Sequence, residues 1–533
     1  MLIFRPSLGK WWGQLLLPIF LLAACGHPST AVGPTLDAAQ TDVPSPTIAA
    51  RVSPFPTSTP TFPVPTNEAT PWPTRLSTPT PALPPMPIPT PSGPPVDTYI
   101  VQPGDTLGAI ALYRCGCELE ELAALNDIQD PASLQVGQTL LIPVQTDRVG
   151  PALPLLPDSE VVYSPAYVGF SVAEFVQQQG GYLADYHELV NGNQVIGADI
   201  VEMVAQRYSV GPRALLALLE YRAGWVSGSP ATESEQYYPI APGNVAQAGL
   251  HYQLSWAANH INEGYYTYKR LGSLAFRFAD GGRALVGDDL NAGTVGIQNV
   301  LALTSDWDTW RRAAGSGGFI RTYNALFGDP YARAIEPLIP ATLTQPTLYL
   351  PWEGGYTWYF SGGSHPAWGD GDAWAALDFA PPDVRGHCAI SSERATAAAP
   401  GLVRRSRDGQ ILIDLDSDGF EQTGWVLFYL HVTPGEGVQE GMSLAQGDLV
   451  GYPSCEGGQA NSSHLHIARR YNGEWMDAAG PVPMVLSGWR AVAGSGQYEG
   501  ELVKEDQVRQ ACECWEDEKN GLVSDNAVLG ADP

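Results

Sequence analysis

The spacing of apolar residues between positions 97 and 145 predicts a small unit of two strands and two helices. Alternating apolar positions at Tyr99 and Val101 are typical of a strand, and residues 140–142 repeat this pattern just before Pro143. Two segments between these strands follow the helical period, and the Thr106 side chain can cap the first of them. The two helical faces consist of Leu107, Ile110 and Ala111, and of Leu119, Leu122 and Leu125.

From about residue 165 to residue 335 the apolar period is helical. Residues 197–225 contain two predicted helices, and Gly211-Pro212 opens the second because proline suits the first turn of a helix. Residues 250–271 predict a third helix that is rich in aromatic side chains. We therefore assign a mainly α-helical middle domain to residues 160–340.

Beyond residue 345 short apolar runs separated by turns predict an antiparallel all-β domain over residues 345–490. The runs include "AWAALDFAP", "GWVLFYLHV" and "SHLHIARRYNG". Residues 491–533 are expected to form a C-terminal tail that carries a C-x-C pair. The chain is thus predicted to be multidomain.

The first 96 residues predict export and a spacer. Residues 1–25 combine Arg5 and Lys10 with the apolar run "LLLPIFLLAAC", which is typical of a signal peptide. The ending "LAAC" resembles a bacterial lipobox, in which Cys25 would be acylated and would anchor the protein to the membrane. Residues 26–96 are rich in Pro and Thr and cannot bury a core, so we expect an extended linker.

Charge and cysteine content narrow the possible partners. The 533 residues carry a formal net charge of −28, which argues against nucleic-acid binding because that needs a basic face. We expect an extracytoplasmic protein, lipid-anchored to the bacterial cell envelope. Cys388 and Cys455 can form a disulfide in an oxidising compartment. The close pairs Cys115/Cys117 and Cys512/Cys514 are left unassigned, with a structural zinc site as one alternative.

Two histidines in one predicted strand indicate a metal site. His464 and His466 point to the same face because strand side chains alternate. A catalytic zinc takes three protein ligands and leaves a fourth position open. Asp378 lies among apolar neighbours and needs a partner if it is buried, which a metal would provide. We expect His365, Asp378 and His466 to bind one Zn²⁺ per chain.

The remaining histidines are candidates for proton transfer. The sequence contains no His-Glu-x-x-His helix, so no glutamate of that type can act as the base. His464 lies on the same face as His466 and is the expected general base. His431 ends the run "GWVLFYLH" and can direct a second imidazole at the developing oxyanion.

Residues 348–480 resemble the lysostaphin-type zinc endopeptidases, in particular their beta-lytic, staphylolysin-like subgroup. The motifs "LPWEGGYTW", "GGSH" followed by "LDF", "YLH", "CEGG" and "HLHIARRYNG" stand in the order of that family. The resemblance implies the same zinc ligands, His365, Asp378 and His466, and the same catalytic histidines, His464 and His431. It also implies hydrolysis of peptide cross-links in peptidoglycan.

Residues 97–145 resemble a LysM module through "YIVQPGDTLGAIA", "LAALN" and "LQVGQTLLIP". LysM modules bind N-acetylglucosamine polymers such as peptidoglycan in a groove between two loops. The resemblance places this groove at Gly104, Asp105 and Thr106 on one loop, and at Asp127 and Ile128 on the other.

The middle domain loosely resembles lysozyme-like transglycosylases, in which a glutamate that closes a helix is the general acid. Glu220 is the corresponding residue, although Tyr221 stands where that family has a serine. If this domain is catalytic, Glu220 would protonate a glycosidic oxygen.

Together these observations predict a lipid-anchored zinc metalloendopeptidase that hydrolyses peptide cross-links of peptidoglycan. The expected architecture is a βααβ LysM module, a mainly helical middle domain and a C-terminal antiparallel all-β metallopeptidase domain. Two alternatives remain open. The protein could be a non-catalytic cell-wall scaffold, or a bifunctional enzyme that also cleaves glycan through Glu220.

Overall fold

The computed structural model describes residues 96–102, 105–144 and 148–526. The predicted signal peptide, Cys25, Gly104 and nearly all of the Pro/Thr-rich linker lie outside these residues. The described residues group into one compact unit. Within the described ranges no helix is both long and apolar enough to cross a membrane.

The N-terminal module has the predicted order of strand, helix, helix and strand. The strands β1 (Val96–Ile100) and β2 (Thr139–Pro143) pair antiparallel, with Tyr99 opposite Leu140. The helix α1 (Leu107–Ala109) begins at Thr106, whose side chain accepts a hydrogen bond from the Ala109 N–H. A π-helical turn continues α1 over Ile110–Cys115, and α2 (Leu119–Leu125) follows. The predicted apolar residues, including Ile110 and Leu122, form a buried core.

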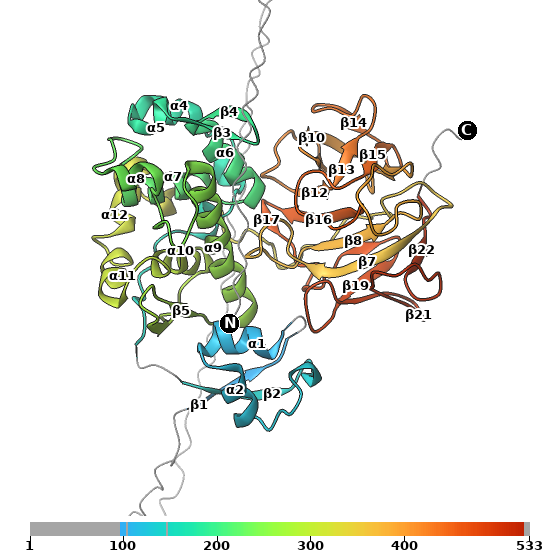
Figure 1. The fold of residues 1–533 in the computed structure, drawn as a ribbon, viewed down its shortest axis with the longest axis horizontal. Helices are drawn as coiled ribbons and strands as arrows, with labels where there is room; N and C mark the ends of the chain where they lie inside the picture. The colour runs from blue at the N-terminus through green and yellow to red at the C-terminus, as the bar shows by residue number, and fades with distance from the viewer. Residues whose placement is uncertain (1–95, 103–104, 145–147, 527–533) are drawn as a thin grey trace, which may run out of the picture. The chain divides into compact units, whose positions relative to one another are not determined.

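The middle domain is mainly helical, and α9 and α10 lie at its centre (Figure 1). The contact between these two helices is close, because a Cβ on Gly264 would lie 3.0 Å from the Gly296 Cα. Two short hairpins that the apolar pattern does not predict, β3–β4 and β5–β6, complete the domain. The helices are α3 (Asp158–Val161), α4 (Val172–Gln179), α5 (Tyr182–Asp185), α6 (Gly197–Tyr208), α7 (Pro212–Ala223), α8 (Glu233–Tyr237), α9 (Leu250–Leu271), α10 (Ala292–Ala302), α11 (Trp307–Ala313) and α12 (Phe319–Phe327). The hairpin strands are β3 (His187–Val190), β4 (Asn193–Ile196), β5 (Ala275–Arg277) and β6 (Arg283–Leu285).

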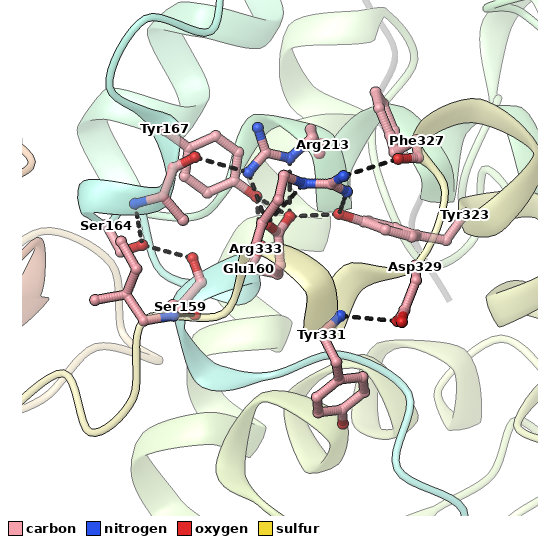
Figure 2. Close-up of polar contacts among 12 residues, drawn as sticks. Ser159, Glu160, Ser164, Tyr167, Arg213, Tyr323, Phe327, Asp329, Tyr331 and Arg333 are labelled. Atoms are coloured by element: carbon pink, nitrogen blue, oxygen red, sulfur yellow. Dashed lines mark hydrogen bonds and ion pairs between the residues drawn. The ribbon is translucent and has the colours of Figure 1, made fainter.

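A buried carboxylate ties the first segment of this domain to two later helices. Glu160 is fully buried and receives two hydrogen bonds from the Arg213 guanidinium on α7, at 2.9 and 2.6 Å. Tyr323 on α12 also donates to Glu160, and Arg333 lies 3.6 Å away (Figure 2). Removing one partner of such a buried pair typically costs about 3–5 kcal/mol because the other charge stays buried.

The C-terminal domain is built from antiparallel sheets, as the alternating pattern predicts. Its main sheet has the strand order β14-β10-β11-β12-β16-β8-β7-β22, with β17 paired to β16. Figure 1 shows β12, β16, β8 and β7 side by side in this sheet. The strands of the domain are β7 (Thr357–His365), β8 (Ala376–Ala380), β9 (Ala395–Thr396), β10 (Gly401–Arg407), β11 (Gln410–Asp414), β12 (Trp425–Leu430), β13 (Val432–Pro434), β14 (Ser443–Leu444), β15 (Leu449–Pro453), β16 (Leu465–Tyr471), β17 (Glu474–Trp475), β18 (Val485–Leu486), β19 (Trp489–Ala493), β20 (Gly500–Lys504), β21 (Gln507–Gln510) and β22 (Gly521–Val523).

The region expected to be a C-terminal tail is part of this domain. β20 and β21 extend the sheet that β18 and β19 begin, and β22 pairs with β7 at the edge of the main sheet. Leu502 and Leu522 are buried in the domain core. Single apolar residues separated by charged ones gave too weak a sequence signal for these strands.

The helical and β domains share one hydrophobic core. Ala375, Phe428 and Trp475 of the β domain belong to the same buried cluster as the helical residues. At its rim, Lys269 of α9 pairs with Glu474 of β17, and the Tyr266 hydroxyl accepts a hydrogen bond from the Trp475 N–H at 3.0 Å. The interface is therefore an integral part of both domains.

Within the part of the chain that the structure describes, three disulfides are formed. Cys388–Cys455 joins two loops of the β domain, as the sequence allowed. Each C-x-C pair, which the sequence left open, bonds internally as Cys115–Cys117 and Cys512–Cys514.

Candidate metal centre and active site

Three neighbouring strands bring the predicted zinc ligands together. Asp378 on β8 is the register partner of His466 on β16 and of Gly362 on β7. His365 is the last residue of β7. A Cβ on Gly362 would lie only 2.7 Å from Asp378 Oδ2, so glycine there makes room for the carboxylate. His365 and His466, 101 positions apart in the chain, thus meet because β7 and β16 both pair with β8.

The three side chains converge on one point. His365 Nε2 lies 3.3 Å from Asp378 Oδ1 and 3.0 Å from His466 Nδ1, and the His466 to Asp378 distance is 3.2 Å. All three residues are buried. Ligands bound about 2.0–2.2 Å from a tetrahedral zinc lie roughly 3.3–3.6 Å from one another. The observed separations are close to that spacing.

The surroundings of these atoms fit a metal ion. Asp378 Oδ1 is buried and accepts no well-aligned hydrogen bond from any residue that the structure describes. The outer nitrogens of the imidazoles are occupied, because His365 Nδ1 donates to Gly363 O at 2.7 Å and His466 Nε2 donates to Ala367 O at 2.9 Å. This arrangement leaves a lone pair on each inner nitrogen, as metal-binding histidines require.

Burial and charge set the protonation states around this point. Burial raises the pKa of Asp378, but the neighbouring imidazoles of His365 and His464 outweigh burial and hold that pKa well below its usual value. Burial together with the neighbouring His464 and His466 lowers the pKa of His431 to about 3. The site therefore combines a carboxylate anion with a neutral His431.

The two candidate catalytic histidines stand beside the three ligands. The His464 and His431 ring centroids are 4.6 Å apart, and His464 Nε2 lies 3.7 Å from Asp378 Oδ1. His464 Nδ1 donates to Ser462 O and His431 Nδ1 donates to Glu456 O, each at 2.8 Å. Both rings are thus fixed in the tautomer in which Nε2 is a proton acceptor. The structure brings all five predicted residues together.

Sequence reasoning missed Tyr498, which stacks on His365 with ring centroids 4.2 Å apart and planes 21° apart. Tyr498 lies in the turn between β19 and β20, and its N–H donates to Ser364 O. A tyrosine in a turn that was assigned to a tail gave no pattern that connects it to the histidines.

A cleft of about 1280 Å³ opens over the site. His365, Asp378, His431, His464 and His466 line it. Residues of the helical domain, including Tyr252 and Trp256 of α9, also line it. The middle domain therefore contributes directly to the space above the candidate metal centre, which its sequence did not indicate.

The residues predicted for glycan binding differ in accessibility. Asp105 is buried. It accepts a hydrogen bond from the Tyr99 hydroxyl at 2.6 Å and forms an ion pair with Arg270 of α9 at 2.7 Å. Its carboxylate therefore stabilises the fold. Thr106 and Ile128 are half-buried, and Asp127 is exposed with a φ of 55°. Glycan binding stays a prediction for these last three residues.

Glu220 has a structural explanation. Its carboxylate accepts hydrogen bonds from the Val226 and Ser227 N–H groups, at 2.8 and 3.1 Å, and from the Ser227 hydroxyl. These bonds fasten the turn that follows α7. Glu220 is not among the residues that line the cleft, and its role as a glycosidic acid stays a prediction.

Comparison with known proteins adds two family matches. Residues 154–341 match the family model "LasA, N-terminal domain", and residues 99–143 match the model "LysM domain". The helical middle domain is thus similar to the LasA N-terminal domain, whereas its sequence motifs only loosely resemble lysozyme-like transglycosylases.

Two curated relatives are similar to more than half of the chain. Both are called "Protease LasA", from Pseudomonas aeruginosa strains UCBPP-PA14 and PAO1. Each is 25% identical over 312 residues, which cover 55% of this chain and 70% of the relative. These matches support a LasA-like peptidase that carries a LysM domain.

Among solved structures, "A Novel M23 Metalloprotease Pseudoalterin from Deep-sea" aligns with a TM-score of 0.27 and 24% identity, over 34% of this chain and 99% of that one. The catalytic domain of lysostaphin from Staphylococcus simulans aligns with a TM-score of 0.16 and 20% identity, over 24% of this chain and 89% of that one.

Proposed function

We propose that this protein is a zinc metalloendopeptidase of the bacterial cell envelope that hydrolyses peptide cross-links of peptidoglycan. The observation that carries this proposal is the convergence of His365, Asp378 and His466, with His464 and His431 beside them, in the lining of one cleft. The similarity to LasA proteases supports a peptidase independently of this geometry.

His365 Nε2, Asp378 Oδ1 and His466 Nδ1 would hold the zinc ion. They supply two neutral nitrogens and one carboxylate oxygen, a donor set that zinc accepts. Three protein ligands would leave a fourth coordination position open. When bound, zinc polarises a carbonyl group and lowers the pKa of water.

The protein's own groups would position and move the protons. His464 Nε2 faces the ligand cluster and can accept a proton, because Nδ1 of the same ring donates to Ser462 O. His431 Nε2 is an acceptor for the same reason. His431 would donate to a developing oxyanion only after it has taken up a proton, which refines the role predicted from sequence.

The remaining parts of the chain fit a cell-wall substrate. The LysM domain would bind the N-acetylglucosamine-containing glycan through Thr106, Asp127 and Ile128. Acylation at Cys25 and the linker over residues 26–96 would tether the enzyme to the membrane and give it reach. We propose this extracytoplasmic, lipid-anchored location from the sequence alone.

Digestion of purified peptidoglycan tests the reaction. We expect new free amino groups and no new reducing sugars, and a zinc chelator should stop the release. Reducing ends that survive the chelator and vanish in Glu220→Gln would show that the helical domain is a glycosidase. If wild-type protein releases neither product but still sediments with cell wall, the protein is a scaffold.

A further inference from the structure

The helical wall of the cleft has a distinctive composition. Along α9, Tyr252, Ser255, Trp256 and Asn259 recur at intervals of three and four residues, so they share the face that lines the cleft. Tyr208 at the end of α6 also lines it. None of these five side chains is a carboxylate, an imidazole, an amine or a guanidinium. This wall is aromatic and polar but uncharged.

The aromatic side chains are available to a ligand. Tyr252 is 54% exposed. Trp256 is half-buried, and its ring packs edge-on against His260 with centroids 4.7 Å apart, which fixes its orientation. Fixed aromatic faces beside hydroxyl and amide groups suit a sugar ring, which offers a C–H face for stacking and hydroxyl and acetamido groups for hydrogen bonds.

The same helix holds the loop that follows His365. Asn259 accepts a hydrogen bond from the Gly371 N–H at 2.9 Å, and the Asn262 amide donates to Asp372 at 2.6 Å. This loop includes Ala367, whose carbonyl fixes the His466 ring. The helical wall is therefore connected to the candidate metal centre through this loop. It is positioned to contact a substrate that is bound there.

The order of the domains argues that the helical domain remains attached to the β domain and is not removed by proteolysis. The LysM domain precedes it and the β domain follows it. A cut between the helical and β domains would separate the peptidase from the module that targets it. The shared core also makes separation costly, because Phe428 and Trp475 would be exposed.

We infer that the α9 wall is a saccharide subsite, which binds the amino-sugar disaccharide next to the peptide that the zinc site cleaves. This inference rests on the proposed peptidase function. The cleft, at about 1280 Å³, is larger than the roughly 300–1,000 Å³ of typical small-ligand sites, so it has room for a peptide and a sugar ring together.

Paired substrates test the inference with the full-length protein. One substrate is a cross-linked muropeptide dimer, and the other is the same dimer after an amidase has removed its disaccharides. Tyr252→Ala should raise KM for the first substrate by roughly 3- to 10-fold and leave KM for the second unchanged. Tyr252→Phe, which keeps the ring, should behave like wild type.

Tyr237→Ala is the matched control, because Tyr237 of α8 is also 54% exposed but does not line the cleft. All variants keep the LysM domain, so a difference between them cannot arise there. Equal effects of Tyr252→Ala on both substrates, or none, would overturn the inference. Faster cleavage of both substrates would show that the wall is a cover over the site.

Affinity measurements distinguish failure of this inference from failure of the proposed peptidase function. Titration of the two dimers into chelator-treated full-length protein measures affinity without turnover. We expect tighter binding of the disaccharide form and loss of that preference in Tyr252→Ala but not in Tyr237→Ala. If the wild type cleaves neither dimer yet shows this preference, the peptidase proposal fails while the subsite stands. Equal affinity for both dimers would refute the subsite.

Discussion

Asp378 Oδ1 lies 3.2 Å from His466 Nδ1 because the two residues are register partners on the paired strands β8 and β16. Strand pairing of this kind fixes both backbones, so the side chains meet without a flexible loop between them. His365 joins them from β7, the other neighbour of β8. A metal centre on three adjacent strands is held more rigidly than one on loops, and this rigidity shapes the following expectations.

Asp378→Ala should lose both zinc and activity. The substitution removes the carboxylate that balances the charge of the ion and leaves two imidazoles, which bind zinc much more weakly. Elemental analysis should find about one zinc per chain in the wild type and a background level in the variant. Asp370→Ala is the control, because Asp370 also lines the cleft but is exposed, and it should keep its zinc. Full zinc occupancy in Asp378→Ala would refute the ligand assignment.

His464→Ala should keep zinc but lose about 10²- to 10⁴-fold in kcat, the usual contribution of a general base. Its Nε2 lies 3.7 Å from Asp378 Oδ1, near the ligands but outside their closest contacts. His387→Ala serves as the control, because His387 is exposed and lies outside the cleft lining. Paired zinc and rate measurements decide the roles. Loss of metal in His464→Ala with retention in His466→Ala would reverse them.

Replacing Cys388 and Cys455 together by serine should lower both stability and kcat. The disulfide closes a segment with a sequence separation of 67, so its loss is expected to cost about 4 kcal/mol in unfolding free energy. Glu456, next to Cys455, provides the carbonyl that fixes His431. Denaturant unfolding and steady-state kinetics measure the two effects.

The matched control for this disulfide is the double serine variant of Cys512 and Cys514, which are only two residues apart. It should change unfolding free energy much less, because a short closed loop restricts the unfolded chain little. Equal losses in both double variants, or an unchanged kcat without Cys388–Cys455, would contradict the positioning role.

Asp372 should make stability depend on pH. Burial raises its pKa to about 7, although the Gly369 N–H, the Asn262 amide and the Trp368 N–H favour its charged form. An unfolded aspartate titrates near pH 3.9, so between about pH 4 and 7 the folded state binds the extra proton. The contribution of Asp372 to stability therefore falls as pH rises through this window and is constant above it.

The difference in unfolding free energy between wild type and Asp372→Asn isolates this dependence, because all other groups titrate in both proteins. We expect the free energy of unfolding of the wild type to fall, relative to that of Asp372→Asn, as the pH rises from 5 to 8. Asp370→Asn, a change at an exposed position two residues away, is the matched control for the substitution itself. A flat profile for Asp372→Asn would show that hydrogen bonding outweighs burial at this carboxylate.

Deleting residues 97–145 should weaken sedimentation with insoluble cell wall and leave cleavage of a small soluble peptide unchanged. The LysM domain is expected to bind glycan, and the metal centre is built entirely from the β domain. Arg270→Ala is the control because it removes the ion pair to Asp105 but keeps the whole module, and it should sediment like wild type. Equal sedimentation of the deletion variant and the wild type would exclude the module as the anchor.

Local patterns predicted the individual elements well. Leu107 and Ile110 on one helix face, and Gly211-Pro212 at the start of α7, depend on interactions within a few residues, which the sequence displays directly. The same holds for His464 and His466, whose common face follows from strand alternation alone. The apolar neighbours of Asp378 and the ligand number of a catalytic zinc added Asp378 and His365, a motif resemblance implied the same residues, and β pairing then placed them together.

By itself, the sequence determined the periodicity of the elements, the candidate ligand set and the cysteines available for bonding. Only the tertiary structure decided that Tyr498 stacks on His365, that β22 completes the main sheet and that α9 forms a wall of the cleft. Each of these depends on contacts between residues more than 100 positions apart. Such contacts form because burying apolar surface such as Trp475 and Leu522 outweighs the entropy of closing long loops, and no local pattern of residues encodes which distant surfaces will meet.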